Sequence, residues 1–280
     1  MEFEFAPQPS ILSDLQLNNP RFVEDTPFAT IWRVTRASGE DAALKLYHQK
    51  GMRNEAKGFE FLSSRDGNGA AHVFEVSDQL ALIEWLDGPS LGDLTRDGED
   101  EKSCMLLVKV AKKLHQYSFE VSENWPDLED WFGSLFRLAF SADADQREVG
   151  LIDEAKKQAR YMLDSQTDMR PLHGDLHHDN VRLGERGFCA FDAKGVVGER
   201  TYELANAFRN PKGARELVFD RHRIELLADH WSQSFDVNRE RLLKWAFVKC
   251  ALSIAWRAKG KFVKDDETEL LGMLFEALRR

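Results

Sequence analysis

Cysteine is scarce in this chain of 280 residues, and its three thiols, Cys104, Cys189 and Cys250, lie far apart. None of them belongs to a CxxC pair, so neither a disulfide framework nor a thiolate metal site is indicated. No uninterrupted apolar run approaches the ~20 residues that a membrane-spanning helix requires, so we expect no membrane partner. Glycine and proline, at 18 and 8 residues, are too few for a collagen-like or proline-rich chain.

Basic residues are also in the minority. There are 38 of them against 48 acidic residues, and the resulting net charge of −10 repels a polyphosphate backbone. We therefore expect no nucleic acid as the main partner. The opening MEFEFAPQPS lacks the basic start and apolar stretch of a secretory signal, which predicts a cytoplasmic protein.

Hydrophobic residues make up 42% of the chain, enough for a core, and the length is near the upper limit for a single one. The first third is predicted to be β-rich. Short apolar runs indicate strands over 30–35, 42–47, 72–76 and 80–85, with a helix over 52–62.

The rest of the chain is predicted to be mainly helical. Repeats near 3.6 residues indicate helices over 103–117, 128–140, 151–163, 215–231 and 239–258. A non-helical island over 170–197 interrupts them, with strand-like pieces at 180–183 and 187–191. This order predicts an α+β fold of two unequal lobes with a cleft between them.

The island contains the residues that indicate chemistry. In PLHGDLHHDN, residues 171–180, His173, Asp175 and Asn180 have the H-x-D-x-x-x-x-N spacing of a kinase catalytic loop. Asp192 follows at the end of the second strand-like piece. Phosphoryl transfer needs a proton acceptor for the substrate hydroxyl and oxygen ligands for Mg²⁺, and these residue types supply both.

Two residues of the first lobe agree with this interpretation. Alternation in the predicted strand places Ala43 and Lys45 on one face, where the small side chain admits a flat base and the ammonium meets phosphates. Glu55, on the following predicted helix, can pair with Lys45. The order of lysine, glutamate, H-x-D-x-x-x-x-N and aspartate is that of the kinase fold.

The stretch LHGDLHHDNVRL, followed by FDAKGVVGERTYELANAFRNP, resembles the aminoglycoside phosphotransferase family, and within it the streptomycin 6-kinases and related antibiotic-resistance kinases. Specific similarity covers about residues 171–211, with weaker support from LIEWLDGPSL. The resemblance implies a bilobal protein-kinase-like fold, with a nucleotide-binding lobe over 1–86, a hinge near 84–89 and a helical lobe over 90–280.

The same resemblance implies an activity. The expected donor is ATP or GTP, the expected metal is Mg²⁺, and the acceptor is a small-molecule hydroxyl, with polycationic aminoglycosides among the candidates. Asp175, in the catalytic loop 173–180, is implied to be the base. Asn180 and Asp192, the latter in the segment 191–195, are implied to hold the metal.

The resemblance also implies the nucleotide contacts. Lys45, supported by Glu55, is implied to contact the phosphates, and the backbone of Glu84 to Leu86 is implied to hydrogen-bond the base. The sequence departs from the family pattern in two places. The phosphate-covering loop, DTPFAT at 25–30, contains no glycine, and Arg182 replaces the apolar residue that usually floors the base. Either the stem of this arginine covers the base, or the strand register differs.

Two alternatives to a kinase stay open. A nucleotide-binding pseudokinase is favoured by the missing glycines, whereas the intact Asp175, Asn180 and Asp192 argue against it. A metal-dependent hydrolase is the second, because potential ligands cluster in the island: His173, His177, His178, Asp175 and Asp179.

The acceptor, the donor base and the oligomeric state are left open by the sequence. Acidic residues of the second lobe are candidates to face a cationic acceptor, although a solvated surface is the simpler interpretation for each: Asp127, Glu129, Asp130 and Glu203. Trp85, Trp125 and Trp131 are predicted to be packing residues in preference to ligand platforms.

Overall fold

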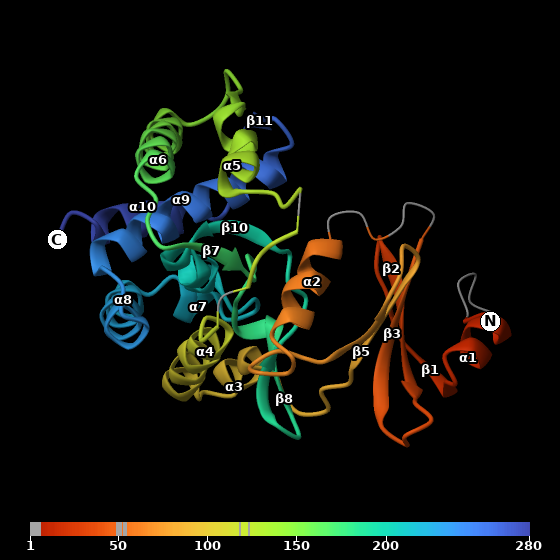
Figure 1. Ribbon diagram of the computed structural model, residues 1–280. Coiled ribbons are helices and arrows are strands. Elements are labelled where there is room, and N and C mark those ends of the chain that lie inside the picture. Colours follow the sequence, from red (N-terminus) through yellow and green to blue (C-terminus); the bar gives the residue numbers. More distant parts are fainter. Residues whose placement is uncertain (1–6, 49–51, 53–54, 118, 123) are drawn as a thin grey trace.

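Five antiparallel strands form one sheet in the first lobe, in the order β1-β2-β3-β5-β4 (Figure 1). The structure is a computed structural model that describes residues 7–48, 52, 55–117, 119–122 and 124–280. The elements of this lobe are α1 (Pro9–Asp14), β1 (Asn18–Asp25), β2 (Ala29–Thr35), β3 (Asp41–Tyr47), α2 (Ala56–Ser64), β4 (Val73–Val76) and β5 (Leu80–Glu84). The hairpins β2–β3 and β4–β5 join through the pair β3–β5, so β3 lies in the middle of the sheet.

Alternation along β3 divides its side chains between two environments. Leu44 is buried on the outer face with Trp32 and Leu82, and residues of α1 pack against this cluster. Lys45 meets Glu55, the residue that precedes α2, on the opposite face. Since successive residues of a strand point to opposite faces, this confirms the predicted division of β3.

The second lobe contains most of the helices. Its elements are α3 (Leu91–Arg96), α4 (Asp100–Leu114), α5 (Leu128–Phe136), β6 (Ala139–Phe140), α6 (Gln146–Asp164), β7 (Met169–Leu172), the 3₁₀ turn η2 (His178–Asn180), β8 (Val181–Gly184), β9 (Gly187–Ala190), β10 (Val196–Glu199), the 3₁₀ stretch η3 (Arg200–Arg209), α7 (Arg215–Val218), α8 (Arg221–Phe235), α9 (Arg239–Ala258), β11 (Lys261–Phe262) and α10 (Thr268–Ala277). The three small pairs β7–β10, β8–β9 and β6–β11 contribute short ribbons.

Helix α9 lies at the centre of this lobe and is buried on nearly all sides between Leu242 and Ala255. Helices α5, α6, α8 and α10 and the stretch η3 pack against it. A helix that is apolar all round belongs in a core, and Lys249 is a charged exception within it. In the part of the chain that the structure describes, no helix combines the length and apolar character needed to cross a membrane.

Helix α2 lies between the sheet and the second lobe (Figure 1). Its Phe59 and Phe61 join the same apolar core as the helices of the second lobe. The core therefore continues across the two lobes at α2.

Most predicted elements are present, and the differences have local causes. The helix predicted over 215–231 is two helices, α7 and α8, because Asp220 accepts a hydrogen bond from the His222 amide at 2.9 Å and starts α8 anew. The helix predicted over 128–140 ends at Phe136. Of the helix predicted over 52–62, residues 53 and 54 lie outside the described residues, and the helix begins at Ala56. Strand β1 was not predicted, because its residues are exposed throughout and show no apolar alternation.

Candidate active site

The predicted catalytic loop follows β7 and leads into η2. The buried His173 accepts a hydrogen bond from the Asp175 amide on Nδ1 (3.3 Å) and donates from Nε2 to the Phe191 carbonyl (3.0 Å). Burial lowers the pKa of His173, which favours this neutral form. The histidine therefore ties the loop to the residue that precedes Asp192.

The Asp175 carboxylate is held by amide groups. Asn206 of η3 donates from Nδ2 to Asp175 Oδ1 at 2.7 Å, and Arg209 donates to Asn206 Oδ1 at 2.9 Å. Arg209 thereby fixes which end of the Asn206 amide faces Asp175. Burial alone would raise the pKa of Asp175, but the nearby charges, Lys249 foremost, outweigh it and hold the pKa below its usual value. Asp175 is thus ionised at neutral pH.

The predicted metal ligand Asn180 lies beside the same carboxylate. Its Nδ2 donates to the Asp175 backbone carbonyl at 3.0 Å and lies 3.5 Å from Asp175 Oδ2. With the amide nitrogen directed at Asp175, the Asn180 side-chain oxygen is the atom left to serve as a metal ligand.

Glu203 lies in the interior of the second lobe and does not face an acceptor, as one interpretation of the sequence had it. It is buried, and it accepts hydrogen bonds from the amides of His173 (2.9 Å) and Gly174 (3.1 Å) and lies 2.7 Å from His115 Nε2. Burial alone would raise the pKa of Glu203, but its hydrogen bond and charge interaction with His115 outweigh this effect and hold the pKa below its usual value. This buried carboxylate therefore holds the start of the catalytic loop, and the interpretation is wrong for this residue.

The predicted lysine–glutamate pair is present. Lys45 pairs with Glu55, which also accepts a hydrogen bond from the Tyr47 hydroxyl at 2.7 Å. Burial would raise the pKa of Glu55, but the charge of Lys45 lowers it, so the pair is ionic. Lys45 Nζ also lies 3.9 Å from Asp192 Oδ1, which brings two of the predicted sites together.

Asp192 has a left-handed backbone, with φ of 57°, and both its carboxylate oxygens accept hydrogen bonds from Lys194 at 3.1 Å. Helix α2 approaches this segment so closely that a side chain at Gly58 has no room: an added Cβ would lie 2.5 Å from the Ala193 carbonyl carbon. Two backbones in direct contact therefore set the position of Glu55 relative to Asp192.

The predicted hinge connects β5 to α3. The Glu84 amide donates to the His72 carbonyl (2.8 Å), and the Glu84 side chain accepts from the His72 amide (3.0 Å) and pairs with Arg186. The Leu86 amide makes no hydrogen bond to another described residue. Its N–H is consequently left without an acceptor among the described residues.

Arg182 belongs to β8, in the register Arg182 to Cys189 of β9. Its Nε donates to the Gly88 carbonyl at 2.7 Å, within the predicted hinge 84–89. The guanidinium therefore ties β8 to the hinge, through a hydrogen bond that no apolar side chain can donate.

The glycine-free loop is a tight turn between β1 and β2. Thr26 closes it: its hydroxyl accepts from the amides of Phe28 (3.3 Å) and Ala29 (3.0 Å) and donates to the Ala29 carbonyl (2.8 Å). These two amides are already satisfied by a threonine, so the turn does not offer them as a glycine-rich loop offers its amides to phosphate.

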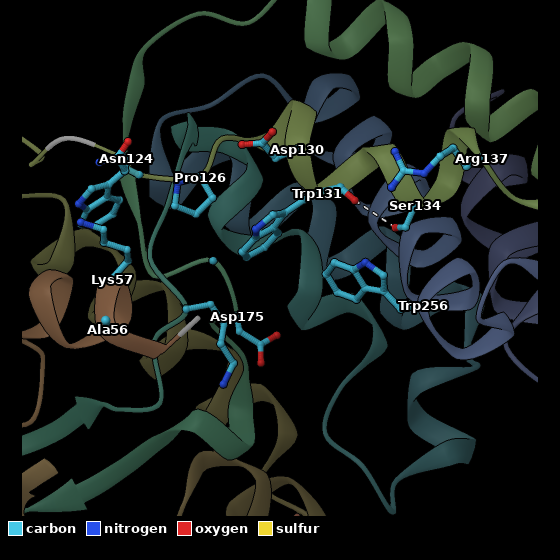
Figure 2. Close-up of a pocket in the computed structure, with 13 residues that line it drawn as sticks. Ala56, Lys57, Asn124, Pro126, Asp130, Trp131, Ser134, Arg137, Asp175 and Trp256 are labelled. Carbon is cyan, nitrogen blue, oxygen red and sulfur yellow. Dashed lines mark hydrogen bonds between the residues drawn. The ribbon is translucent and has the colours of Figure 1, made fainter. Parts of the chain in front are cut away.

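Asp175 lies where two cavities meet. The first, of about 860 Å³, is lined by Ala56, Lys57, Asn124, Trp125, Pro126, Asp130, Trp131, Ser134, Arg137, Gly174, Asp175, Lys194 and Trp256. Figure 2 shows the Trp131 and Trp256 indoles side by side with Asp175 below them, and their ring centroids are 5.8 Å apart. Trp125 and Trp131 pack against the core, as predicted, and they also line this cavity.

The second cavity, of about 850 Å³, extends from Asp175 along η3 and α9 to the loop before α10. Its lining includes Asn206, Arg209, Lys249, Trp256 and Glu267. Neither cavity is uniformly acidic. Of the other predicted acceptor-facing residues, Asp130 lines the first cavity, Asp127 caps α5, and Glu129 pairs with Arg160 at 2.6 Å.

The ligand set of a metal hydrolase is not assembled. His178 turns away from Asp175 and lies 3.5 Å from Cys104 Sγ, and Asp179 pairs with Arg96 at 2.9 Å. Among the described residues, the three potential ligands that converge are Asp100, Cys104 and His178. Arg223 donates to both Asp100 oxygens and already supplies the positive charge there.

A loop carboxylate, a lysine–glutamate pair and a second aspartate around a cleft between two lobes define the class as a protein-kinase-like phosphotransferase. The chain belongs to the aminoglycoside/hydroxyurea antibiotic resistance kinase family, whose model matches residues 16–260. It is 35% identical to a streptomycin 3''-kinase from Klebsiella pneumoniae over 208 residues, 72% of this chain and 76% of that protein.

A streptomycin 6-kinase from Streptomyces griseus is 24% identical over 230 residues, 80% of this chain and 73% of its own length. The fold is shared with a choline/ethanolamine kinase family protein from Mesorhizobium loti, at a TM-score of 0.64 and 12% identity over 93% of this chain and 87% of that one. This chain is a small-molecule kinase that uses ATP, and the predicted family, fold class and enzyme class are confirmed.

Proposed function

We propose that this kinase transfers the γ-phosphate of Mg²⁺–ATP to a hydroxyl of an aminoglycoside of the streptomycin type. The observation that supports this most is the ionised Asp175 at the junction of two large cavities, held by Asn206. The two streptomycin kinases among the relatives support the choice of acceptor.

The residues predicted to hold Mg²⁺ have the chemistry that this hard cation prefers, a carboxylate and an amide oxygen. Asn180 directs its amide nitrogen to Asp175, which leaves its side-chain oxygen for a metal. Asp192 follows Phe191, whose amide donates to the Asn180 backbone carbonyl at 3.0 Å, and carries two more oxygens. When bound, the ion neutralises charge on the phosphates. Lys45, fixed in direction by Glu55 and 3.9 Å from Asp192, contacts phosphate oxygens.

The acceptor hydroxyl is oriented by Asp175, which takes its proton as the oxygen bonds to the γ-phosphorus and the bond from that phosphorus to ADP breaks, so that ADP leaves. Asn206 holds this carboxylate from one side, so it approaches the hydroxyl in one direction. The adenine lies against the hinge, where the Glu84 carbonyl and the Leu86 amide bind its edge. Because Thr26 occupies two amides of the phosphate turn, we expect Lys45 and the metal to supply most of the phosphate affinity.

The cationic groups of an aminoglycoside fit the first cavity. Indole faces attract cations, and Trp131 and Trp256 lie side by side there with Asp130 on the same rim (Figure 2). The basic residues Lys57, Arg137 and Lys194 line the cavity too, so the indole faces and Asp130, and not a uniformly acidic lining, support the binding of cationic groups there.

Streptomycin, other aminoglycosides, choline and hydroxyurea, each incubated with Mg²⁺ and either ATP or GTP, test the proposal by mass spectrometry. We expect an added phosphate on streptomycin. In the matched variant Asp175→Asn, which keeps the shape but removes the proton acceptor, the rate should fall about 10²–10⁴-fold with nucleotide binding retained. A phosphorylated product from choline or hydroxyurea and none from any aminoglycoside contradicts the proposed acceptor. Near-normal turnover by the variant contradicts the role of Asp175.

A further inference from the structure

Lys249 is a charged residue in the most buried stretch of the protein. It belongs to the central helix α9, its exposed fraction is 2%, and its neighbours Val248 and Cys250 are fully buried. Lys249, Ser253 and Trp256 recur at helical spacing and all three line the second cavity, which ends at Asp175. The lysine therefore sits in the wall of a cavity that contains the proposed base.

The ammonium group of Lys249 is only partly satisfied by the protein. Its Nζ donates to the Ser253 hydroxyl at 3.3 Å and lies 4.4 Å from the centre of the Trp256 ring. No carboxylate of the residues that the structure describes comes within 4.0 Å of it. An ammonium has three N–H donors, and burying it without an ion-pair partner opposes folding. The fold alone does not explain this lysine.

Two arginines of the same cavity, the half-buried Arg209 and the exposed Arg257, are paired with carboxylates. Arg209 makes a two-pronged pair with Glu267, with distances of 2.7 to 2.9 Å, and Arg257 pairs with Asp265 at 2.8 Å. Burial lowers the pKa of Lys249 to about 8, with the charge of Asp175 opposing that fall. Lys249 is thus a buried cation in the wall of this cavity, and the negative charge that favours its protonated form most is that of Asp175, the proposed base.

We propose that Lys249 is an acceptor-binding residue, whose ammonium donates hydrogen bonds to oxygen atoms of the acceptor next to the hydroxyl that is phosphorylated. This inference rests on the proposed function and sharpens it. A protonated amine at that position is repelled by Lys249, whereas a hydroxyl or carbonyl oxygen is bound. The acceptor is therefore two-sided: its cationic part faces the tryptophans of the first cavity, and its oxygen-rich part faces Lys249.

The test compares Lys249→Met, Lys249→Gln and the control Lys244→Met. Lys244 is on the same helix, pairs with Glu240 at 2.7 Å, and lines neither cavity. Streptomycin is titrated calorimetrically in the presence of Mg²⁺ and a non-hydrolysable ATP analogue, and the melting temperature of each free protein is measured.

For Lys249→Met we expect streptomycin to bind about 10- to 100-fold more weakly, the range for a lost hydrogen bond to a charged group, with unchanged nucleotide affinity. Lys249→Gln keeps N–H donors and should retain part of the affinity. Lys244→Met should bind streptomycin normally. The melting temperature of Lys249→Met should change little, because the cost of burying the ammonium is removed while its favourable charge interaction with Asp175 is lost.

A clear fall in the melting temperature of Lys249→Met means that the lysine serves the fold, and it overturns the inference without any acceptor. Equal streptomycin affinity for Lys249→Met and wild type overturns it as well. If the wild type neither binds nor phosphorylates streptomycin, the proposed acceptor is wrong. The affinity comparison is then made with the compound that mass spectrometry shows to be phosphorylated. The proposed acceptor and the proposed role of Lys249 can therefore be refuted independently.

Discussion

The contact between α2 and the Asp192 segment can be opened by one methyl group. A Cβ added at Gly58 would overlap the Ala193 carbonyl oxygen and would lie 2.5 Å from the Ala193 carbonyl carbon and 3.2 Å from the Lys194 nitrogen. Ordinary contact begins at 3.4 Å, so the carbonyl carbon alone requires the two backbones to separate by about 0.9 Å, the difference between 3.4 and 2.5 Å, and the oxygen requires more. Because backbone meets backbone there, no side-chain rotation relieves the clash.

This displacement acts directly on the site. Glu55 precedes Gly58 by three residues and Asp192 precedes Ala193, so a separation lengthens the 3.9 Å contact from Lys45 to Asp192 and disturbs the Lys45–Glu55 pair. A misplacement near 1 Å costs about 100-fold in rate. We therefore expect the kcat of Gly58→Ala to fall by about that factor.

The assay measures kcat and KM for Mg²⁺–ATP with streptomycin as acceptor, together with the melting temperature. The matched control is Gly150→Ala in α6, where an added Cβ meets no atom within 4 Å. Alanine there should leave kcat unchanged and stabilise the helix by about 0.5–1 kcal/mol. If Gly58→Ala also keeps kcat within threefold of wild type, the close approach of α2 does not set the active geometry, and the argument from Gly58 is refuted.

Two further substitutions examine the proposed metal ligand Asp192 and Asn206, the hydrogen-bond partner of Asp175. Asp192→Ala should weaken nucleotide binding strongly in the presence of Mg²⁺ and little in its absence, measured by calorimetry, because the lost interaction exists only with the ion; an equal loss under both conditions contradicts a metal role. Asn206→Ala removes the 2.7 Å hydrogen bond to Asp175. Since that bond favours the ionised carboxylate, its loss raises the pKa of Asp175, so the acid limb of the kcat–pH profile should move to higher pH and kcat should fall about 10-fold. An unmoved acid limb would show that Asn206 does not act on this carboxylate.

The sequence alone determined the parts of this protein that depend on neighbours along the chain. The spacing of His173, Asp175 and Asn180 predicted the catalytic loop, because a short loop of given residue types has few conformations. Alternation predicted the division of β3, and period-3.6 repeats predicted the main helices. Local signals failed where they are weak, as in the exposed strand β1, or where a cap interrupts a periodic run, as Asp220 does.

The tertiary structure decided which distant residues meet. Glu203 looked like an acceptor-side carboxylate, but its burial against the His173 amide makes it a support of the catalytic loop. Asn206 was inside the stretch that carried the family resemblance, and Lys249 was a lone lysine in the apolar repeat of a helix. Both signals were visible, yet neither pointed to Asp175. Their convergence on that carboxylate results from the packing of η3 and α9, which is a property of the whole core and not of any local segment.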